Sequence, residues 1–379
     1  MTELIGTIFH LTDMHLCVER DGALRENTRW LSRLLVRGAR KMPGASMRNV
    51  LAGSMWHREP ALEGLRRTLP LLLREETQAP ADSSAPIVVL QGGDVEALGS
   101  WAPRHHSGYT AFPSFDFVHT HLSRHEAGAA WLDVFGNHDT WPGMVPVVPT
   151  STARHNRARI ATVPGLEGPW PAPVELATVP VPLVVARVNT VAREPVGELL
   201  AYGAVSEHPP DPERPDDVME QLTAQLAPWR DRPAVRVVLL HHPVHYAEGA
   251  SDIGPRRLDG AKQLARCLSE LRVQLVIAGH VHALDPPAGE QDLEAGSQSP
   301  LEYPTAQLVA ETPTQDWPPG GNGADDYAAL PTRSFCRYRL LAEGETFAVE
   351  RTVYRWYDAN AGFSPVGDPT TVFSGMPLA

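Results

Sequence analysis

Five short apolar runs in this sequence end in aspartate, histidine or both. The fullest example is residues 132–139, where a glycine at position 136 is followed by Asn137, His138 and Asp139. Glycine lets the backbone turn sharply at the end of a buried strand. The three side chains after it offer a neutral oxygen ligand, a proton donor and a carboxylate that can orient the donor. This order of residue types predicts a catalytic centre rather than an ordinary turn.

The other four runs supply groups of the same kind. They end in Asp13 with His15, in Asp94, in His241 with His242, and in His280 with His282. Imidazoles and carboxylates with one amide oxygen suit first-row transition metals rather than Ca²⁺ or Mg²⁺ alone. One tetrahedral ion cannot use so many ligands. Two ions roughly 3.5–4 Å apart, with Asp94 as a shared carboxylate, would use them.

A pair of such ions performs a definite kind of chemistry. It polarises a phosphoryl oxygen and lowers the pKa of a bridging water, so that hydroxide exists at neutral pH to attack phosphorus. A nearby imidazole can then protonate the departing oxygen. The residue types therefore predict hydrolysis of a phosphate ester.

Strand and helix signals alternate along the chain, which is typical of an α/β fold. Buried strands are predicted at residues 5–11, 87–90, 181–188, 235–240, 273–278 and 306–310, and helices at 26–42, 61–74, 218–226 and 264–271. Residues 101–123 predict an irregular rim loop, with a short helical piece after it, and residues 141–180 a long irregular excursion. Two alternating runs, 335–341 and 347–357, predict a hairpin. Because α/β sheets bind ligands at the carboxyl ends of their strands, the five ends are expected to converge.

The motifs, in their order, resemble a known set. Asp13-x-His15, Gly93-Asp94, Gly136-Asn137-His138-Asp139, His241 and Gly279-His280-x-His282 are similar to the five signature blocks of the calcineurin-like metallophosphoesterase superfamily. Its bacterial cyclic-nucleotide phosphodiesterase-like members are the most similar. The resemblance implies a four-layer αββα sandwich of two mixed β-sheets flanked by helices, with the metal site at the strand carboxyl ends.

The same resemblance implies how the chain divides and what each residue does. Residues 1–300 would form the catalytic domain, with insertions at about 22–85 and 141–180, and residues 301–379 would add strands that complete its second sheet. Asp13, His15, Asp94 and His282 would hold the first ion, and Asp94, Asn137, His241 and His280 the second. His138 would be the general acid and Asp139 its orienting group. The ions would be Mn, Fe, Zn or similar transition metals.

Composition limits the partners. The formal net charge is −12 and no run of Lys and Arg stands out, so nucleic acid is not the expected partner. We expect the partner to be a small phosphate ester, a class that includes nucleotides, and leave the oligomeric state open. Three widely spaced cysteines and the lack of a leader-like or membrane-length apolar run predict a cytoplasmic protein.

The remaining histidines and the first cysteine have plainer interpretations. His105, His106, His119, His121 and His125 are expected to be solvated residues of the rim. His242 is expected to turn away from the ions and to pack or hydrogen-bond behind them. Cys17 is expected to be a buried thiol, and His245 either faces the phosphate or lies on a loop.

Two other functions use the same motifs. One is a nuclease similar to the catalytic subunit of double-strand-break repair complexes, against which the acidic composition argues. The other is a non-catalytic interaction scaffold that keeps the fold, a fate that would be marked by loss of ligands. The metal content of the purified protein distinguishes these alternatives, because the enzyme should hold close to two ions per chain whereas a scaffold can lack them.

Overall fold

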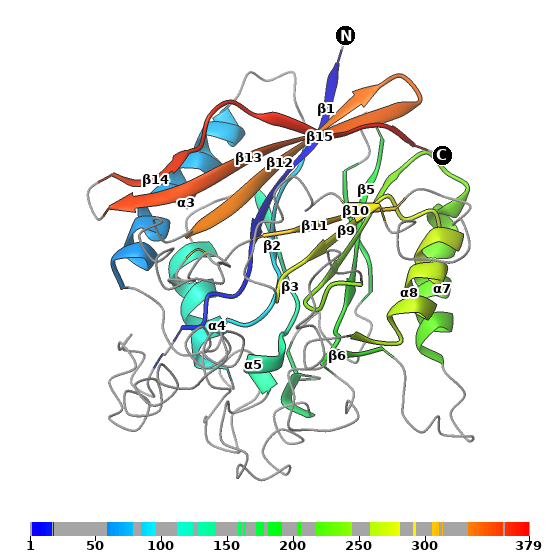
Figure 1. Ribbon diagram of the computed structural model, residues 1–379, viewed down its shortest axis with the longest axis horizontal. Coiled ribbons are helices and arrows are strands. Elements are labelled where there is room, and N and C mark those ends of the chain that lie inside the picture. The colour runs from blue at the N-terminus through cyan, green and yellow to red at the C-terminus, as the bar shows by residue number, and fades with distance from the viewer. Residues whose placement is uncertain are drawn as a thin grey trace, which may run out of the picture.

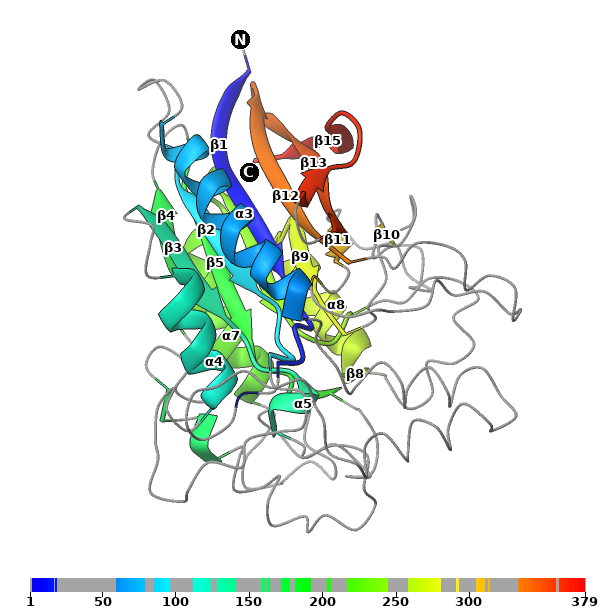
Figure 2. The same cartoon turned by 90° about the vertical axis from the view of Figure 1, so that its left-hand side faces the viewer.

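Two β-sheets pack face to face and carry helices on their outer sides (Figure 1, Figure 2). The structure is a computed structural model of the chain. It describes residues 2–16, 18, 59–78, 85–95, 112–123, 128–140, 158–160, 162–163, 172–177, 181–191, 203–205, 217–244, 258–280, 291–292, 305–310, 313, 333–358 and 361–378. The α/β sandwich expected from the sequence is confirmed.

The first sheet has the strand order β14-β13-β12-β1-β2-β3, with β15 paired to β13. Its strands are β1 (Glu3–Leu11), β2 (Ile87–Gln91), β3 (Ala129–Asp133), β12 (Ser334–Glu343), β13 (Thr346–Asp358), β14 (Gly362–Pro365) and β15 (Thr370–Pro377). β1, β2 and β3 run parallel, whereas β12 runs antiparallel to β1. The carboxyl ends of β1, β2 and β3 therefore lie at one edge.

The second sheet has the order β10-β11-β9-β7-β5-β4. Its strands are β4 (Val174–Ala177), β5 (Leu183–Val188), β7 (Val235–Leu240), β9 (Leu275–Ala278), β10 (Gln291–Asp292) and β11 (Ala306–Val309). β5, β7, β9 and β11 are parallel. Two further short strands, β6 (Gly203–Ala204) and β8 (Leu258–Asp259), pair with each other.

Three apolar clusters hold these layers together. The first fills the space between the sheets with residues such as Ile8, Val237 and Tyr338. The second joins the first sheet to α3 (Glu59–Gln78) and α4 (Pro113–Val118), and the third joins the second sheet to α7 (Asp217–Arg230) and α8 (Ala261–Glu270). Because β5, β7 and β9 are covered on both faces, they are buried along their whole length, which explains why their sequences are apolar except for Arg187 in β5 and Arg236 in β7.

The C-terminal hairpin forms where it was predicted, but it belongs to the other sheet. β12 and β13 are joined at Gly344 and pair from Ser334 opposite Arg355 to Glu343 opposite Thr346, and β12 lies beside β1. The hairpin thus extends the first sheet rather than completing the second. Among the described residues after position 300, the second sheet contains β11 alone. Hydrophobic alternation shows which residues are buried but does not specify the neighbouring strand.

Two loop predictions were partly wrong. Within residues 101–123 the chain is helical over α4 and a π-helical turn, η2 (His119–Ser123), and the short helical piece expected after it is instead β3. Within residues 141–180 the chain forms β4, an antiparallel edge strand beside β5. α4 and β4 are too short to show a clear periodicity in the sequence. Prolines before and after β4 are tolerated because this strand lies at the sheet edge.

The predicted helix at 26–42 lies outside the described residues, and the one at 61–74 is α3.

An ion pair ties η2 to β3. Nε2 of His119 lies 2.9 Å from Oδ2 of Asp133, whose other oxygen accepts a hydrogen bond from the Trp131 indole. Burial lowers the pKa of His119, but Asp133 and the more distant Asp116 raise it by more, so the net shift is upward. His119 is therefore not the solvated rim residue that the sequence predicts.

No helix within the described ranges is long and apolar enough to cross a membrane.

We predict that His119→Gln removes a pH-dependent part of the stability. Because the folded-state pKa is raised, the ion pair stabilises the fold fully below about pH 6.5, and this contribution is lost as the pH rises through the folded-state pKa. At pH 5.5 the variant should lose about 1–2 kcal/mol of unfolding free energy, and less at pH 8.5. Urea unfolding at both pH values measures this difference. Asp133→Asn should remove the same pH dependence, and an unchanged dependence in both variants would contradict the pairing.

Candidate metal centre

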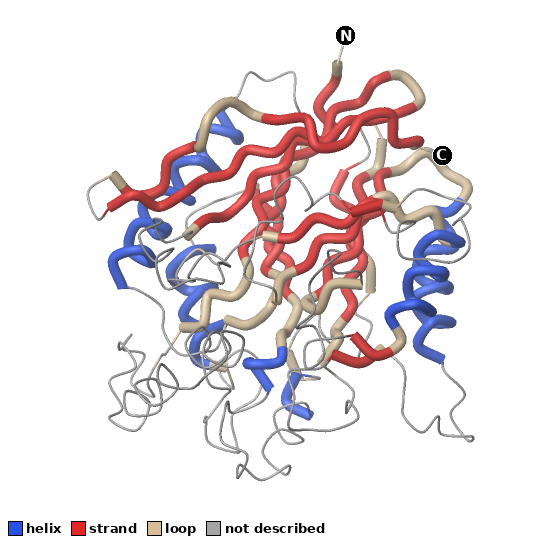
Figure 3. Tube along the Cα trace, viewed as in Figure 1, coloured by secondary structure: helices blue, strands red, loops and turns tan. Residues whose placement is uncertain are grey.

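The loops after five strands meet at one edge of the two sheets. β1, β2 and β3 deliver them from the first sheet, and β7 and β9 from the second (Figure 3). Backbone hydrogen bonds continue past the strands, from Asp13 N–H to the carbonyl of Gly93 and from Gly279 N–H to the carbonyl of His241. The predicted convergence of the strand ends is therefore observed for the described residues.

The backbone of this edge is strained. Five non-glycine residues of the described chain have positive φ, and four of them are candidate ligands: Asp13, His15, Asp94 and His280, with φ of 54°, 45°, 53° and 74°. Such conformations cost of order 1 kcal/mol each and collect at functional sites, where the surrounding fold imposes them. The strain indicates that these turns are kept because they place the ligand side chains, although their backbone conformation is itself unfavourable.

Two motif glycines are required by close approach. A Cβ on Gly136 would collide with the carboxylate and backbone of Asp94, and a Cβ on Gly279 would collide with Thr12 and Asp13. The loops after β3 and β9 thus press directly against the acids delivered by β2 and β1.

Asp94 occupies the middle of the cluster. Its Oδ1 accepts a hydrogen bond of 2.7 Å from the backbone N–H of His138. Its Oδ2 lies 3.2 Å from Nε2 of His241 and 4.0 Å from Nε2 of His15, with no well-formed hydrogen bond from the described residues. Burial raises the pKa of Asp94, but His241, His138 and His15 lower it by more, so it stays well below the usual range. Asp94 is therefore an ionised carboxylate placed between two groups of imidazoles.

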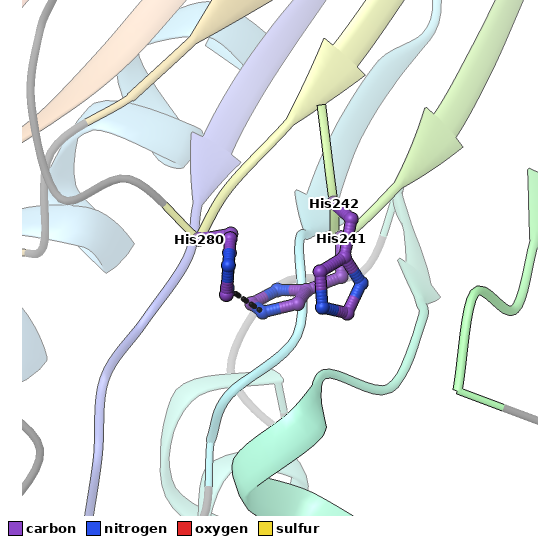
Figure 4. A group of neighbouring side chains, drawn as sticks. All are labelled: His241, His242 and His280. Atoms are coloured by element: carbon purple, nitrogen blue, oxygen red, sulfur yellow. Dashed lines mark hydrogen bonds between the residues drawn. The ribbon is translucent and has the colours of Figure 1, made fainter. Parts of the chain in front are cut away.

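His241 shows most directly what the cluster can bind. Its Nδ1 lies 2.7 Å from the carbonyl oxygen of Gly92, which can only accept, so Nδ1 carries a hydrogen and Nε2 has the lone pair of the neutral ring. Around Nε2 lie Oδ1 of Asn137 at 3.1 Å, Oδ2 of Asp94 at 3.2 Å and Nδ1 of His280 at 3.2 Å (Figure 4). Ligands of a tetrahedral ion with bonds of 2.0–2.1 Å lie about 3.3 Å apart. The donor set therefore fits one transition-metal ion.

The charge around His241 also favours a cation. Burial lowers the pKa of this ring, but Asp94 and then Asp13 raise it by more, to about 9. A negative potential that favours a proton at this point favours a metal ion equally.

A second group lies on the other side of Asp94. Oδ2 of Asp13 accepts hydrogen bonds from the Thr12 hydroxyl at 2.6 Å and from the backbone N–H of His280 at 2.8 Å, while Oδ1 lies 3.9 Å from Nε2 of His15. The rings of His15 and His138 meet edge to face, with centroids 4.7 Å apart. Ligand atoms of His15, Asp94 and His138 lie within 4.8 Å of one another, and so do those of Asp13, Asp94 and His241. Asp94 belongs to both groups, as a shared ligand must.

A known family model covers the part of the chain that holds these groups. The family model described as Calcineurin-like phosphoesterase matches residues 6–284 of the 379-residue chain. The chain belongs to the calcineurin-like phosphoesterases. Membership implies a hydrolase of phosphate esters that uses bound metal ions. No curated protein matches the chain at a significant level.

In this calcineurin-like phosphoesterase the structure brings most of the predicted site residues together. Those that converge are Asp13, His15, Asp94, Asn137, His138, His241 and His280. Asp139 accepts hydrogen bonds from the backbone N–H groups of Gly136 and Asp94, and its role in orienting His138 stays a prediction. His282, Cys17, His105, His106, His125 and His245 lie outside the described residues.

Sequence reasoning missed one residue of the phosphoesterase site. Thr12 holds Oδ2 of Asp13 through its hydroxyl, and this leaves Oδ1 as the oxygen that faces His15. The only signal was a hydroxyl residue next to the first aspartate, and many turns share that pattern.

We predict that Asp94→Asn lowers the metal content to about half of the wild-type value or less, because the charge shared by both groups is lost. Elemental analysis of protein purified with Mn²⁺ measures this. Asp133→Asn is the matched control, since Asp133 is equally buried on the adjacent strand but contacts His119 and Trp131. Equal metal content in the Asp94 variant and the control would exclude the shared role.

Proposed function

We propose that this protein is a dinuclear metal-dependent phosphoesterase that hydrolyses a small phosphodiester or phosphomonoester. The observation that carries the proposal is the convergence of Asp94, Asn137 and His280 on Nε2 of His241. Asp13, His15 and Asp94 supply donors for a first ion, together with His282 as the family resemblance implies. When bound, such ions supply Lewis acidity to a phosphoryl oxygen and an acidified water.

The chain's own residues would position the substrate and move the proton. The backbone N–H of His138 is held by Oδ1 of Asp94, and its imidazole stands against His15, beside the donors proposed for the first ion. At this place the ring can protonate the leaving oxygen as a general acid. Asp139 ties the backbone of Gly136 and Asp94 together and so keeps the acid and the shared carboxylate in a fixed relation.

For the substrate we propose a small ester with a nucleotide as the favoured class. The chain carries a net charge of −12, which is unfavourable for a polyanion but is locally offset by cations in the site. The blocks most resemble cyclic-nucleotide phosphodiesterase-like members of the superfamily, and this similarity supports a cyclic nucleotide. Mn, Fe or Zn suits the mixture of imidazole, carboxylate and amide donors. A cytoplasmic location stays a prediction.

A hydrolysis panel tests the substrate class. Protein loaded with Mn²⁺ is assayed with aryl phosphodiesters, aryl monoesters, 2′,3′- and 3′,5′-cyclic nucleotides and linear duplex DNA. We expect hydrolysis of a small ester, abolished by chelation and restored by Mn²⁺. Salt-sensitive degradation of DNA without small-ester activity would favour a nuclease. Two bound ions with no hydrolysis, or no bound ions at all, would contradict the proposal.

We predict that His138→Ala keeps its metal but loses activity selectively. Loss of a general acid should lower kcat by about 10²–10⁴-fold for an ester with a poor, alkoxide leaving group. A p-nitrophenyl ester should lose much less, because its leaving group departs without a proton. The ratio of the two rates serves as the internal control. Full activity on a cyclic nucleotide would show that another group is the acid.

A further inference from the structure

A third imidazole stands beside the two that face the second metal position. His242 follows His241 directly, and its ring centroid lies 4.4 Å from that of His280 and 4.8 Å from that of His241 (Figure 4). The His241 and His280 centroids are 5.0 Å apart, so the three buried rings form a compact triangle. Family membership assigns no role to His242, and the two-ion scheme uses only the other two.

His242 is held from the side of the second sheet that faces the helices. Successive residues of a strand point to opposite faces, and His241 faces the space between the sheets. β5 and β7 pair in parallel with Val188 opposite Leu240, so the residues after the strands, Thr190 and His242, come to the same outer side. There the Thr190 hydroxyl lies 2.7 Å from Nδ1 of His242, within hydrogen-bond distance.

The β6 backbone closes the other side of the ring. A Cβ on Gly203 would collide with the His242 imidazole, so the chain at this point passes against the ring face. The next residue, Ala204, donates its backbone N–H to the carbonyl of Thr190 at 2.8 Å. The residue that supplies the hydroxyl for Nδ1 is therefore hydrogen-bonded to the neighbour of the glycine that limits the position of the ring.

The His280 ring needs such support. Its backbone is in the left-handed region, and its N–H is already used to hold Asp13. The torsion that rotates an imidazole about its bond to Cβ has a broad minimum, so packing must decide where Nδ1 points. Contact with the neighbouring rings of His242 and His241 provides that packing.

We propose that Thr190, His242 and Gly203 form a clamp that positions the His280 ring for the second metal ion. In this arrangement His242 is a positioning residue: the Thr190 hydroxyl holds Nδ1, and the ring packs against His280. The ligand set proposed around Nε2 of His241 is filled by Asp94, Asn137 and His280 without it. The inference rests on the proposed function, since it presupposes that a second ion binds at His241 and His280.

Metal binding to the full-length protein tests the clamp. Chelator-treated protein is titrated with Mn²⁺ in a calorimeter, and the metal-free forms are melted in parallel. Thr190→Val and His242→Phe should each weaken one of the two Mn²⁺ binding steps about ten-fold and leave the other within about two-fold, as loss of a supporting hydrogen bond does. Thr190→Ser, which keeps the hydroxyl, should bind both ions like the wild type.

A matched control separates this effect from general loosening. Thr305→Val removes an equally buried hydroxyl, which donates to the carbonyl of Val273 at 2.8 Å where β9 and β11 begin, at the opposite end of these strands from the metal groups. It should lower the melting temperature about as much as Thr190→Val and leave both Mn²⁺ affinities unchanged.

The outcomes distinguish a failure of the proposed function from a failure of the clamp alone. A wild-type protein that binds no Mn²⁺ refutes the proposed function, whereas two wild-type ions with unchanged affinities in Thr190→Val or His242→Phe refute only the clamp. Equal weakening of both steps shows a merely structural role and also refutes it. A far larger loss in His242→Phe than in Thr190→Val makes His242 a ligand and overturns the positioning role. If Thr190→Val does not fold, His242→Phe and Thr190→Ser give the same test.

Discussion

Three carboxylates are buried within one small volume, and their need for compensation organises the edge of the sandwich. Asp13, Asp94 and Asp139 are each no more than 1% exposed. A buried ionised carboxylate costs several kcal/mol unless partners satisfy it. Each of the three accepts a backbone N–H from another loop: His280 for Asp13, His138 for Asp94, and Asp94 for Asp139. Asp139 also accepts the N–H of Gly136 in its own loop. These hydrogen bonds tie the loops together, because the backbone of one loop satisfies the buried carboxylate of a neighbouring loop.

The surroundings of the cluster strengthen this constraint. His10, on β1 below the site, is fully buried, and burial lowers its pKa to about 3 despite the opposing effect of Asp13. Such an environment screens charge weakly, so attraction between the carboxylates and a cation is much stronger than in water. Metal affinity in this chain therefore follows from the packed sheets as much as from the donor atoms.

The two sheets contribute different ligands. The first supplies Asp13, His15, Asp94 and Asn137, while the second supplies His241 and His280. An ion held at His241 would join the sheets at the edge where the apolar core between them ends. Binding to the folded state alone would also raise the stability of the sandwich by mass action. The left-handed conformations of the ligand residues are tolerated because the preceding strands and the backbone hydrogen bonds between the loops fix each turn.

Local patterns in the sequence determined much of the fold and the site. The apolar runs of β1, β2, β5, β7 and β9 were readable because strands covered on both faces contain almost no polar residues, and their ends were marked by Asp, His and Gly. Tertiary structure alone decided which strands are neighbours, and for this reason the β12–β13 hairpin extends the sheet of β1. It also decided that Thr12 orients Asp13 and that Thr190 meets His242 across two strands. The physical reason is that strand pattern and ligand type are properties of adjacent residues, whereas register, close approach and the partner of a hydrogen bond arise only when distant segments pack.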